Sequence, residues 1–120
     1  HYNINYHLVW IPKYRKRILV GTIKEDLEIA IHEIADKMEV EIESLEVQSD
    51  HIHLFLSSPP RYAPAKLINA FKGATSHRLR NKYPHLKSLP SMWTKTYYVG
   101  TAGNVSVEVI KRYIEECQGT

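Results

Sequence analysis

Two histidines separated by one residue are the part of this sequence best suited to chemistry. His51 and His53 lie in the stretch 50–58, which begins with an aspartate and is otherwise rich in strand-forming apolar residues. Residues two apart on a strand project to the same side of a sheet, so both imidazoles share one face. Two neutral imidazoles on a rigid strand, with Asp50 beside them, form part of a small metal site whose remaining ligand must come from elsewhere in the fold. The alternative is a pair of half-exposed histidines with no chemical role.

Charge is unevenly distributed along the chain. The net charge is only +3, but the span from His51 to Val107 contains eight Lys and Arg residues and no Asp or Glu. A second basic cluster occupies residues 13–17. Such segregation indicates a surface that faces a polyanion, most commonly a phosphate backbone. A basic surface that serves only solubility is the alternative.

Length and composition limit the class of protein. The 120 residues, 43% apolar and 24% charged, predict one domain spanning 1–120 with a single core. We find no apolar run of membrane-spanning length and no signal-peptide pattern, and the single Cys117 excludes an internal disulfide. These features lead us to expect a cytoplasmic protein.

Apolar periodicity predicts the order of secondary structure. The predicted elements are strand 4–11, helix 22–37, strand 40–47, strand 51–58, helix 64–83, loop 85–93, strand 96–101, turn 102–105 and a helix that Ser106 caps. Alternation changes phase between Ile42 and Leu45, which indicates a β-bulge. Gly73 within a helix is unfavourable, and we attribute it to close packing on the sheet. His7 interrupts the first strand and is interpreted as a half-buried or substrate-side residue.

The predicted order β-α-β-β-α-β corresponds to the ferredoxin-like (RRM-like) α+β plan, with an antiparallel sheet covered by two helices on one face. Ile52 and its neighbours two residues apart then face the helices, which leaves His51 and His53 on the open face. The extra C-terminal helix is the element left to cover that face and could bring Tyr113 to the histidines. A core tyrosine on an apolar stripe is the alternative for Tyr113.

Several ordered motifs carry a resemblance to a known family. They are the segments 49–55 (SDHIHLF), 59–64 (PPRYAP), 71–73 (FKG), Trp93, 97–99 (YYV), 103–106 (GNVS) and 111–116 (KRYIEE). Together they resemble the single-tyrosine transposases of the His-hydrophobe-His superfamily, which move insertion sequences (the IS200/IS605 type) as single-stranded DNA. The resemblance spans nearly the whole chain and implies the fold that the element order predicts.

The resemblance implies a metal-dependent DNA transposase that cleaves and rejoins single-stranded DNA. In it, His51 and His53 hold Mg²⁺ or Mn²⁺, and Tyr113 is the nucleophile that forms a 5′-phosphotyrosine. Relatives place a third ligand, a glutamine, four residues after the tyrosine, where this chain has Cys117 and then Gln118. We expect Gln118 to be the ligand, because its oxygen suits magnesium better than a thiolate does.

The same resemblance implies a homodimer and single-stranded DNA partners with hairpins near the element ends, and no membrane. The candidate DNA contacts are Lys13, Arg15, Lys16, Arg17, Lys66, Lys72, Arg78 and Arg80. Two other classes stay open at this point. One is a rolling-circle replication initiator or relaxase, and the other is a non-enzymatic RRM-like RNA-binding module, which would use aromatic residues on its open sheet face.

Overall fold

A computed structural model describes residues 2–101 and 106–117 of the chain. Its elements are β1 (Ile4–Trp10), the 3₁₀ turn η1 (Lys13–Arg15), α1 (Gly21–Met38), β2 (Glu41–Gln48), β3 (His51–Ser58), α2 (Pro64–Lys82), η2 (Pro84–Ser88), β4 (Tyr98–Gly100) and α3 (Val107–Cys117). This is the predicted α+β, ferredoxin-like order with an additional C-terminal helix. The predicted turn at 102–105 lies outside the described residues.

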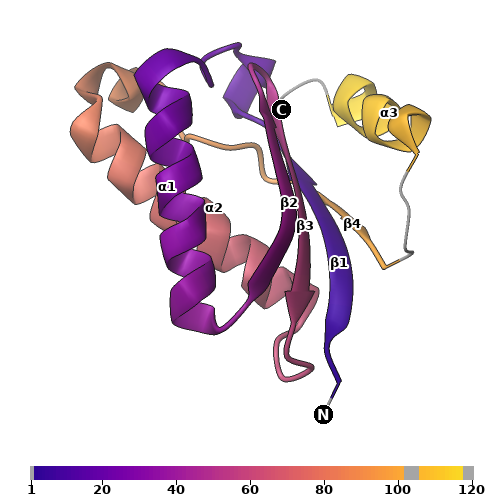
Figure 1. Cartoon of the computed structure of the whole chain (residues 1–120). Coiled ribbons are helices and arrows are strands. Elements are labelled where there is room, and N and C mark those ends of the chain that lie inside the picture. The colour runs from indigo at the N-terminus through magenta and orange to yellow at the C-terminus, as the bar shows by residue number, and fades with distance from the viewer. Residues whose placement is uncertain (1, 102–105, 118–120) are drawn as a thin grey trace.

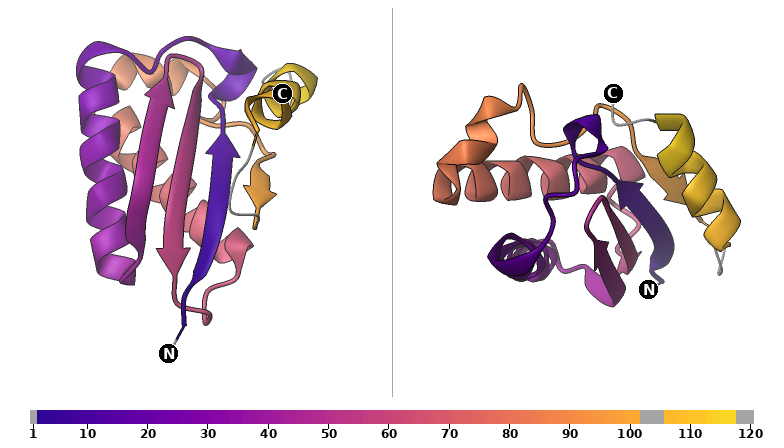
Figure 2. Two further views of the ribbon diagram at one scale, coloured as in Figure 1. Left: turned by 45° about the vertical axis from the view of Figure 1, so that its right-hand side comes forward. Right: turned by 90° about the horizontal axis from the view of Figure 1, so that it is seen from above.

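The four strands form one antiparallel sheet in the order β2-β3-β1-β4. Helices α1 and α2 lie against one face of the sheet, and α3 lies on the opposite side (Figure 1). The two further views confirm that α3 is separated from the helical layer by the sheet (Figure 2). The histidine strand β3 is therefore central, with helices on both sides of it.

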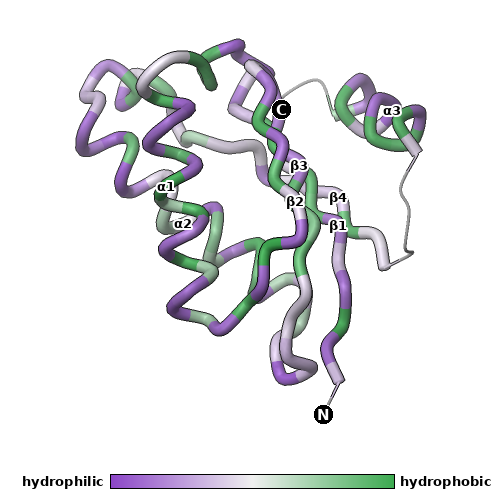
Figure 3. Tube along the Cα trace, viewed as in Figure 1, coloured by the Kyte–Doolittle hydropathy of each residue, from purple (hydrophilic) through white to green (hydrophobic). Residues whose placement is uncertain are grey.

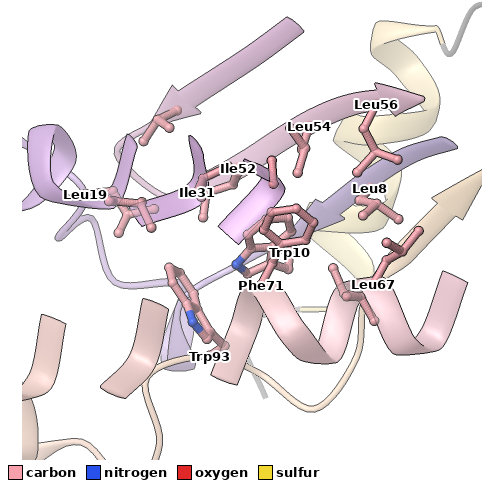
Figure 4. Packing of buried hydrophobic residues seen from close by; sticks show 14 of the residues in the cluster. Leu8, Trp10, Leu19, Ile31, Ile52, Leu54, Leu56, Leu67, Phe71 and Trp93 are labelled. Carbon is pink, nitrogen blue, oxygen red and sulfur yellow. The ribbon is translucent and has the colours of Figure 1, made fainter. Parts of the chain in front are cut away.

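The core fills the space between the sheet and the α1–α2 layer. Ile52, Leu54 and Leu56 of β3 are fully buried on this face, together with Trp10 of β1 and Phe71 of α2 (Figure 4). Burial of one such aliphatic side chain contributes roughly 2 kcal/mol. Each helix shows both apolar and polar stretches (Figure 3), as expected for helices that bury one side. The predicted inward face of β3 is confirmed.

The predicted bulge in β2 is present. Ile42 pairs with Leu56 and Ser44 pairs with the next residue of β3, Phe55, so Glu43 is the unpaired extra residue. The bulge lets Ile42 and Leu45 face the same apolar core although they are three residues apart. Glu46 and Gln48 then project to the face that carries the histidines.

Three local predictions are corrected by the structure. Gly73 is exposed, and a Cβ there would meet no atom within 4 Å, so close packing does not explain it. The predicted loop 85–93 contains most of the 3₁₀ turn η2. Strand β4 (Tyr98–Gly100) is shorter than the predicted 96–101, and the carbonyl of Thr96 accepts from the Lys72 ammonium at 3.4 Å.

Candidate active site

His51 is held by the residue before it in the chain. Its Nδ1 lies 2.9 Å from Oδ1 of Asp50. The two side chains are mostly buried, with 18% and 13% of their surfaces exposed. Asp50 belongs to the turn that precedes β3 and so is not bound by the alternation of the strand, which allows both side chains to meet. A carboxylate only accepts hydrogen bonds, so Nδ1 of His51 carries the proton of this bond and Nε2 is the nitrogen available to a ligand.

Asp50 also contacts the basic loop after β1. The Nε atom of Arg15 donates to Oδ2 of Asp50 at 3.0 Å. Burial favours a raised pKa for Asp50, but the hydrogen bonds from His51 and Arg15 outweigh it and lower the pKa below its usual value. Asp50 is therefore a carboxylate at neutral pH and accepts from both neighbours at once.

His53 is held from the other side, by His7 of β1. The Nδ1 atom of His7 lies 2.9 Å from Nε2 of His53, and the His7 ring stacks on Phe55 with centroids 4.2 Å apart. Burial, with the nearby His7, lowers the pKa of His53, so the imidazole stays neutral. His7 is only 6% exposed and is thus more buried than the sequence predicted.

The contact of His7 with the histidine pair is the main feature that we did not predict. The strand register pairs His7 with Phe55 and Val9 with His53, which puts these four side chains on one face of the sheet. The only signal in the sequence was that a histidine, His7, interrupts an otherwise apolar strand. It could not be used without the pairing of β1 with β3.

A pocket of about 610 Å³ lies between this face and α3. Its walls are formed by the sheet residues Glu46, Gln48, Asp50, His51 and His53, by Arg15, and by Val107, Ile110, Lys111, Ile114 and Glu115 of α3. The expectation that the C-terminal helix covers the histidine face is met. The pocket is polar on its sheet side and mixed on its helix side.

Tyr113 does not line this pocket. Its hydroxyl lies 3.4 Å from Oγ1 of Thr96, and its ring lies against that of Tyr98 with centroids 6.2 Å apart. Burial raises the pKa of the Tyr113 phenol to about 12, although the hydrogen bond with Thr96 acts in the opposite direction. In this arrangement α3 turns Tyr113 towards β4 and the segment before it, while other residues of the helix face the histidines.

Cys117 shares the environment of Tyr113. Its Sγ lies 2.9 Å from Oγ1 of Thr96 and 3.8 Å from Oγ1 of Thr94. The thiol is therefore placed with the threonines and is not among the residues that line the histidine pocket. Gln118, the predicted third ligand, lies outside the described residues.

The donor set at the pocket fits a divalent ion in part. Among the described residues there is no group of three His, Cys, Asp or Glu side chains arranged around one metal position. His51 has the arrangement typical of a metal-ligating histidine, with one ring nitrogen on a carboxylate and the other available. His53 offers Nε2 only if it exchanges its bond with His7. A hard ion that takes its remaining ligands from oxygen atoms is compatible with this pair.

The predicted DNA contacts separate into exposed and engaged side chains. Lys16, Arg17 and Lys66 are exposed. Lys13 lies over the ring of Tyr14, 5.5 Å from its centroid.

The remaining basic side chains are engaged within the chain, Arg15 with Asp50 as described above. Arg78 pairs with Glu33 at 2.6 Å, and Arg80 donates to the carbonyl of Leu89 at 2.9 Å. Lys72 is half-buried, its ammonium bonds two backbone carbonyls, and burial lowers its pKa. Four of the eight predicted residues, Arg15, Lys72, Arg78 and Arg80, therefore make contacts within the chain.

Comparison with known proteins identifies consistent relatives. The family model described as "Transposase IS200 like" matches residues 1–117. The ISDra2 transposase TnpA of Deinococcus radiodurans is 35% identical over 117 residues, which cover 95% of this chain and 84% of that protein. The transposase for insertion sequence element IS200 of Salmonella typhimurium is 29% identical over 121 residues, covering 96% and 80%.

Solved structures show the same fold. A crystal structure described as that of a transposase from Deinococcus radiodurans superposes with a TM-score of 0.89 at 33% identity, covering 97% of this chain and 92% of that one. A REP-associated tyrosine transposase bound to a REP hairpin gives a TM-score of 0.64 at 16% identity, covering 97% and 63%, and shows likeness of fold alone. No helix in the described part of the chain is long and apolar enough to cross a membrane.

Proposed function

Because this chain belongs to the IS200-like transposase family, we propose that it cleaves and rejoins single-stranded DNA at the ends of an insertion sequence, through a 5′-phosphotyrosine on Tyr113. The observation that carries the proposal is the pair of imidazoles on one face of β3, each hydrogen-bonded to a neighbouring side chain at a pocket beside the tyrosine helix. A neutral imidazole presents a nitrogen lone pair without adding positive charge.

His51 and His53 are the residues that would hold Mg²⁺ or Mn²⁺, with Gln118 as the third protein ligand. When bound, the ion supplies Lewis-acid polarisation of the scissile phosphate and fixes its orientation. Cys117 is not part of this proposal, since its thiol contacts Thr96 and a thiolate matches magnesium poorly.

Tyr113 is the nucleophile in this proposal. Its oxygen attacks the phosphorus, the new P–O bond forms on the tyrosine, and the bond to the 3′ oxygen breaks to leave a 3′-hydroxyl. The phenolic proton is lost in the same step, and the 3′ oxygen takes up a proton as it leaves. Burial of Tyr113 beside Thr96 raises the pKa of the phenol, which disfavours the loss of that proton. A 3′-hydroxyl from a second cut end then reverses the step and joins the strands.

We further propose that the active form is a homodimer. Within one chain, α3 points Tyr113 at Thr96 while its other side borders the histidine pocket. A tyrosine that faces away from the histidines of its own subunit can serve those of a second subunit. The competing arrangement is that Tyr113 acts with the histidines of its own subunit.

Single-stranded DNA with hairpins is the proposed partner. One related structure is described as bound to a REP hairpin, which makes a hairpin a reasonable ligand for this chain. The exposed side chains of Lys16, Arg17 and Lys66 are free of the internal contacts that engage Arg78 and Lys72, so we assign them the phosphate contacts. Arg15 belongs to the pocket wall and would contact DNA there.

The proposal is tested by substitution of the nucleophile. A single-stranded oligonucleotide that carries a family-type hairpin and cleavage site is mixed with protein and Mg²⁺, and covalent adducts are resolved on a denaturing gel. Tyr113→Phe should form no adduct while binding the same DNA normally, because only one hydroxyl is lost. Tyr98→Phe is the matched control, since its ring contacts that of Tyr113, and it should still form the adduct. An adduct formed by Tyr113→Phe at the normal rate would refute the assignment.

A further inference from the structure

Asp50 has no role in the chemistry above, yet it joins two residues that do. Its Oδ1 bonds Nδ1 of His51 at 2.9 Å, and its Oδ2 accepts from Nε of Arg15 at 3.0 Å. We propose that Asp50 is a positioning residue, which holds His51 with Nε2 directed to the metal and is itself held by Arg15. The inference rests on the proposed function, because it assumes that His51 is a metal ligand.

The contact with Asp50 selects the tautomer of His51. A neutral imidazole carries its one proton on either nitrogen, and the unprotonated nitrogen is the one that binds a metal. The carboxylate of Asp50 stabilises the form with the proton on Nδ1. It also fixes the ring rotation, since the bond joins consecutive residues at the start of a rigid strand. Both effects reduce the cost of binding an ion through Nε2.

Of the two histidines, Asp50 bonds only His51 among the described hydrogen bonds. Asp50 is 13% exposed, its two oxygens each have a protein partner, and it lines the same pocket as His51. His53, by contrast, bonds His7 through Nε2 and has no contact with Asp50 among the described hydrogen bonds. Loss of the Asp50 carboxylate should therefore alter His51 and leave His53 unchanged.

Arg15, the other partner of Asp50, comes from a loop with an unfavourable backbone. Tyr14 and Arg15 have φ values of 60° and 51°, in the left-handed region that residues with a Cβ adopt at a cost. Arg15 in this conformation reaches Asp50 with Nε, and the residue also lines the pocket. A DNA phosphate bound by the Arg15 guanidinium would thus be connected to His51 through two consecutive contacts.

The test begins with the metal-free protein. The ¹⁵N resonances of the His51 ring at pH 8, assigned by comparison with His51→Ala, should show the proton on Nδ1 in the wild type. In Asp50→Ala the ring should shift towards the mixture of tautomers found in free histidine. Asp50→Asn has one acceptor oxygen for two donors, and because the charged Arg15 competes for that oxygen, the amide NH₂ should face Nδ1 of His51 and shift the ring proton to Nε2. The resonances of His53 should stay in place in both variants.

The second readout is Mn²⁺ affinity, measured by the electron paramagnetic resonance signal of the free ion. Asp50→Ala and Asp50→Asn should each bind Mn²⁺ about 10- to 100-fold more weakly, the usual effect of losing such a partner. Glu25→Gln removes an exposed carboxylate of α1, on the opposite side of the sheet from His51, and should change affinity by less than about threefold. Thermal melts of all variants confirm folding.

The outcomes separate the two proposals. An unchanged His51 tautomer together with unchanged Mn²⁺ affinity in Asp50→Ala overturns the positioning role. Wild-type Mn²⁺ affinity in Asp50→Asn despite a proton shifted to Nε2 also overturns it, because the tautomer of His51 would then have no effect on the metal. Absence of Mn²⁺ binding by the wild-type protein refutes the metal site of the proposed function, and the tautomer measurement alone then decides whether Asp50 orients His51.

Discussion

The two faces of the sheet differ in how they keep water out. On the helix-covered face, the β3 side chains Ile52, Leu54 and Leu56 are fully excluded from solvent by other apolar groups. On the opposite face, His51 and His53 stay partly exposed beneath α3 and contact polar partners instead. Alternation along β3 therefore places the residues that stabilise the core on one face and the two histidines on the other. Residues on the second face can serve a reaction because the fold depends little on their burial.

The largest expected effects test this separation directly. Leu54→Ala should destabilise the protein by about 2–5 kcal/mol, because it opens a cavity in the core. His51→Ala should change stability by only about 1 kcal/mol, the scale of a single hydrogen bond. If His51 is the proposed metal ligand, its loss removes several kcal/mol of charge stabilisation and should lower the cleavage rate about a thousandfold or more. Urea unfolding and single-turnover cleavage measure the two quantities.

A different result would break the comparison. If His51→Ala unfolded the protein as readily as Leu54→Ala, the histidine face would be structural. If Leu54→Ala remained folded at low temperature but had lost cleavage, the two faces would be coupled. Hairpin binding by the folded variants is the control, since phosphate contacts provide most of the affinity and need no metal.

A smaller effect on stability is expected from the ion pair that joins α1 to the end of α2. Asp26 of α1 accepts hydrogen bonds from Lys82, at 2.8 Å, and from the Tyr83 hydroxyl, and these bonds lower its pKa. A pKa depressed by folding stabilises the protein above the unfolded value of 3.8, and this stability is lost as the pH falls through the folded pKa. Between pH 6 and pH 3 the urea midpoint of the wild type should therefore fall more than that of Asp26→Asn. Equal changes of the urea midpoint with pH in the two proteins would show that the contacts of Asp26 do not stabilise the fold.

The smallest effect concerns the attachment of α3. Thr96 provides the hydroxyl that both Tyr113 and Cys117 contact, so Thr96→Val should weaken the docking of the helix by about 1 kcal/mol or less. Hydrogen exchange should become faster in residues 107–117 and remain unchanged in β1 and β3. Ser91→Ala, on the same loop but without contact to α3 in the described bonds, is the matched control. Equal exchange in both variants would show that Thr96 does not hold the helix.

The separation of the faces was predictable from the sequence because it depends on local periodicity. The alternation of β3 placed His51 and His53 opposite Leu54, and the phase change in β2 located the bulge, before any contact was known. Element boundaries followed from local signals such as Pro64 at the start of α2. Ser106 caps α3 as predicted, through its bond to the N–H of Val109 at 3.2 Å.

The parts that were not predictable depend on distant contacts. The His7–His53 bond joins residues 46 apart, so it requires the register of two strands. The direction of Tyr113 depends on how α3 is rotated on Thr96, which periodicity does not determine. The bonds from the Lys72 ammonium to the carbonyls of Thr94 and Thr96 also join distant residues, and the sequence shows only the charge of Lys72.

The bulge at Glu43 has a consequence for how the gene can change. Because Glu43 is the unpaired residue between Ile42 and Ser44, its deletion would leave these two as neighbours opposite Leu56 and Phe55, in regular antiparallel register. A three-nucleotide deletion at this codon would thus preserve the inward and outward positions of the whole strand. The same deletion inside β3 would move every following side chain to the other face. Variation in length among descendants of this gene should therefore be tolerated at codon 43 and eliminated between codons 51 and 58.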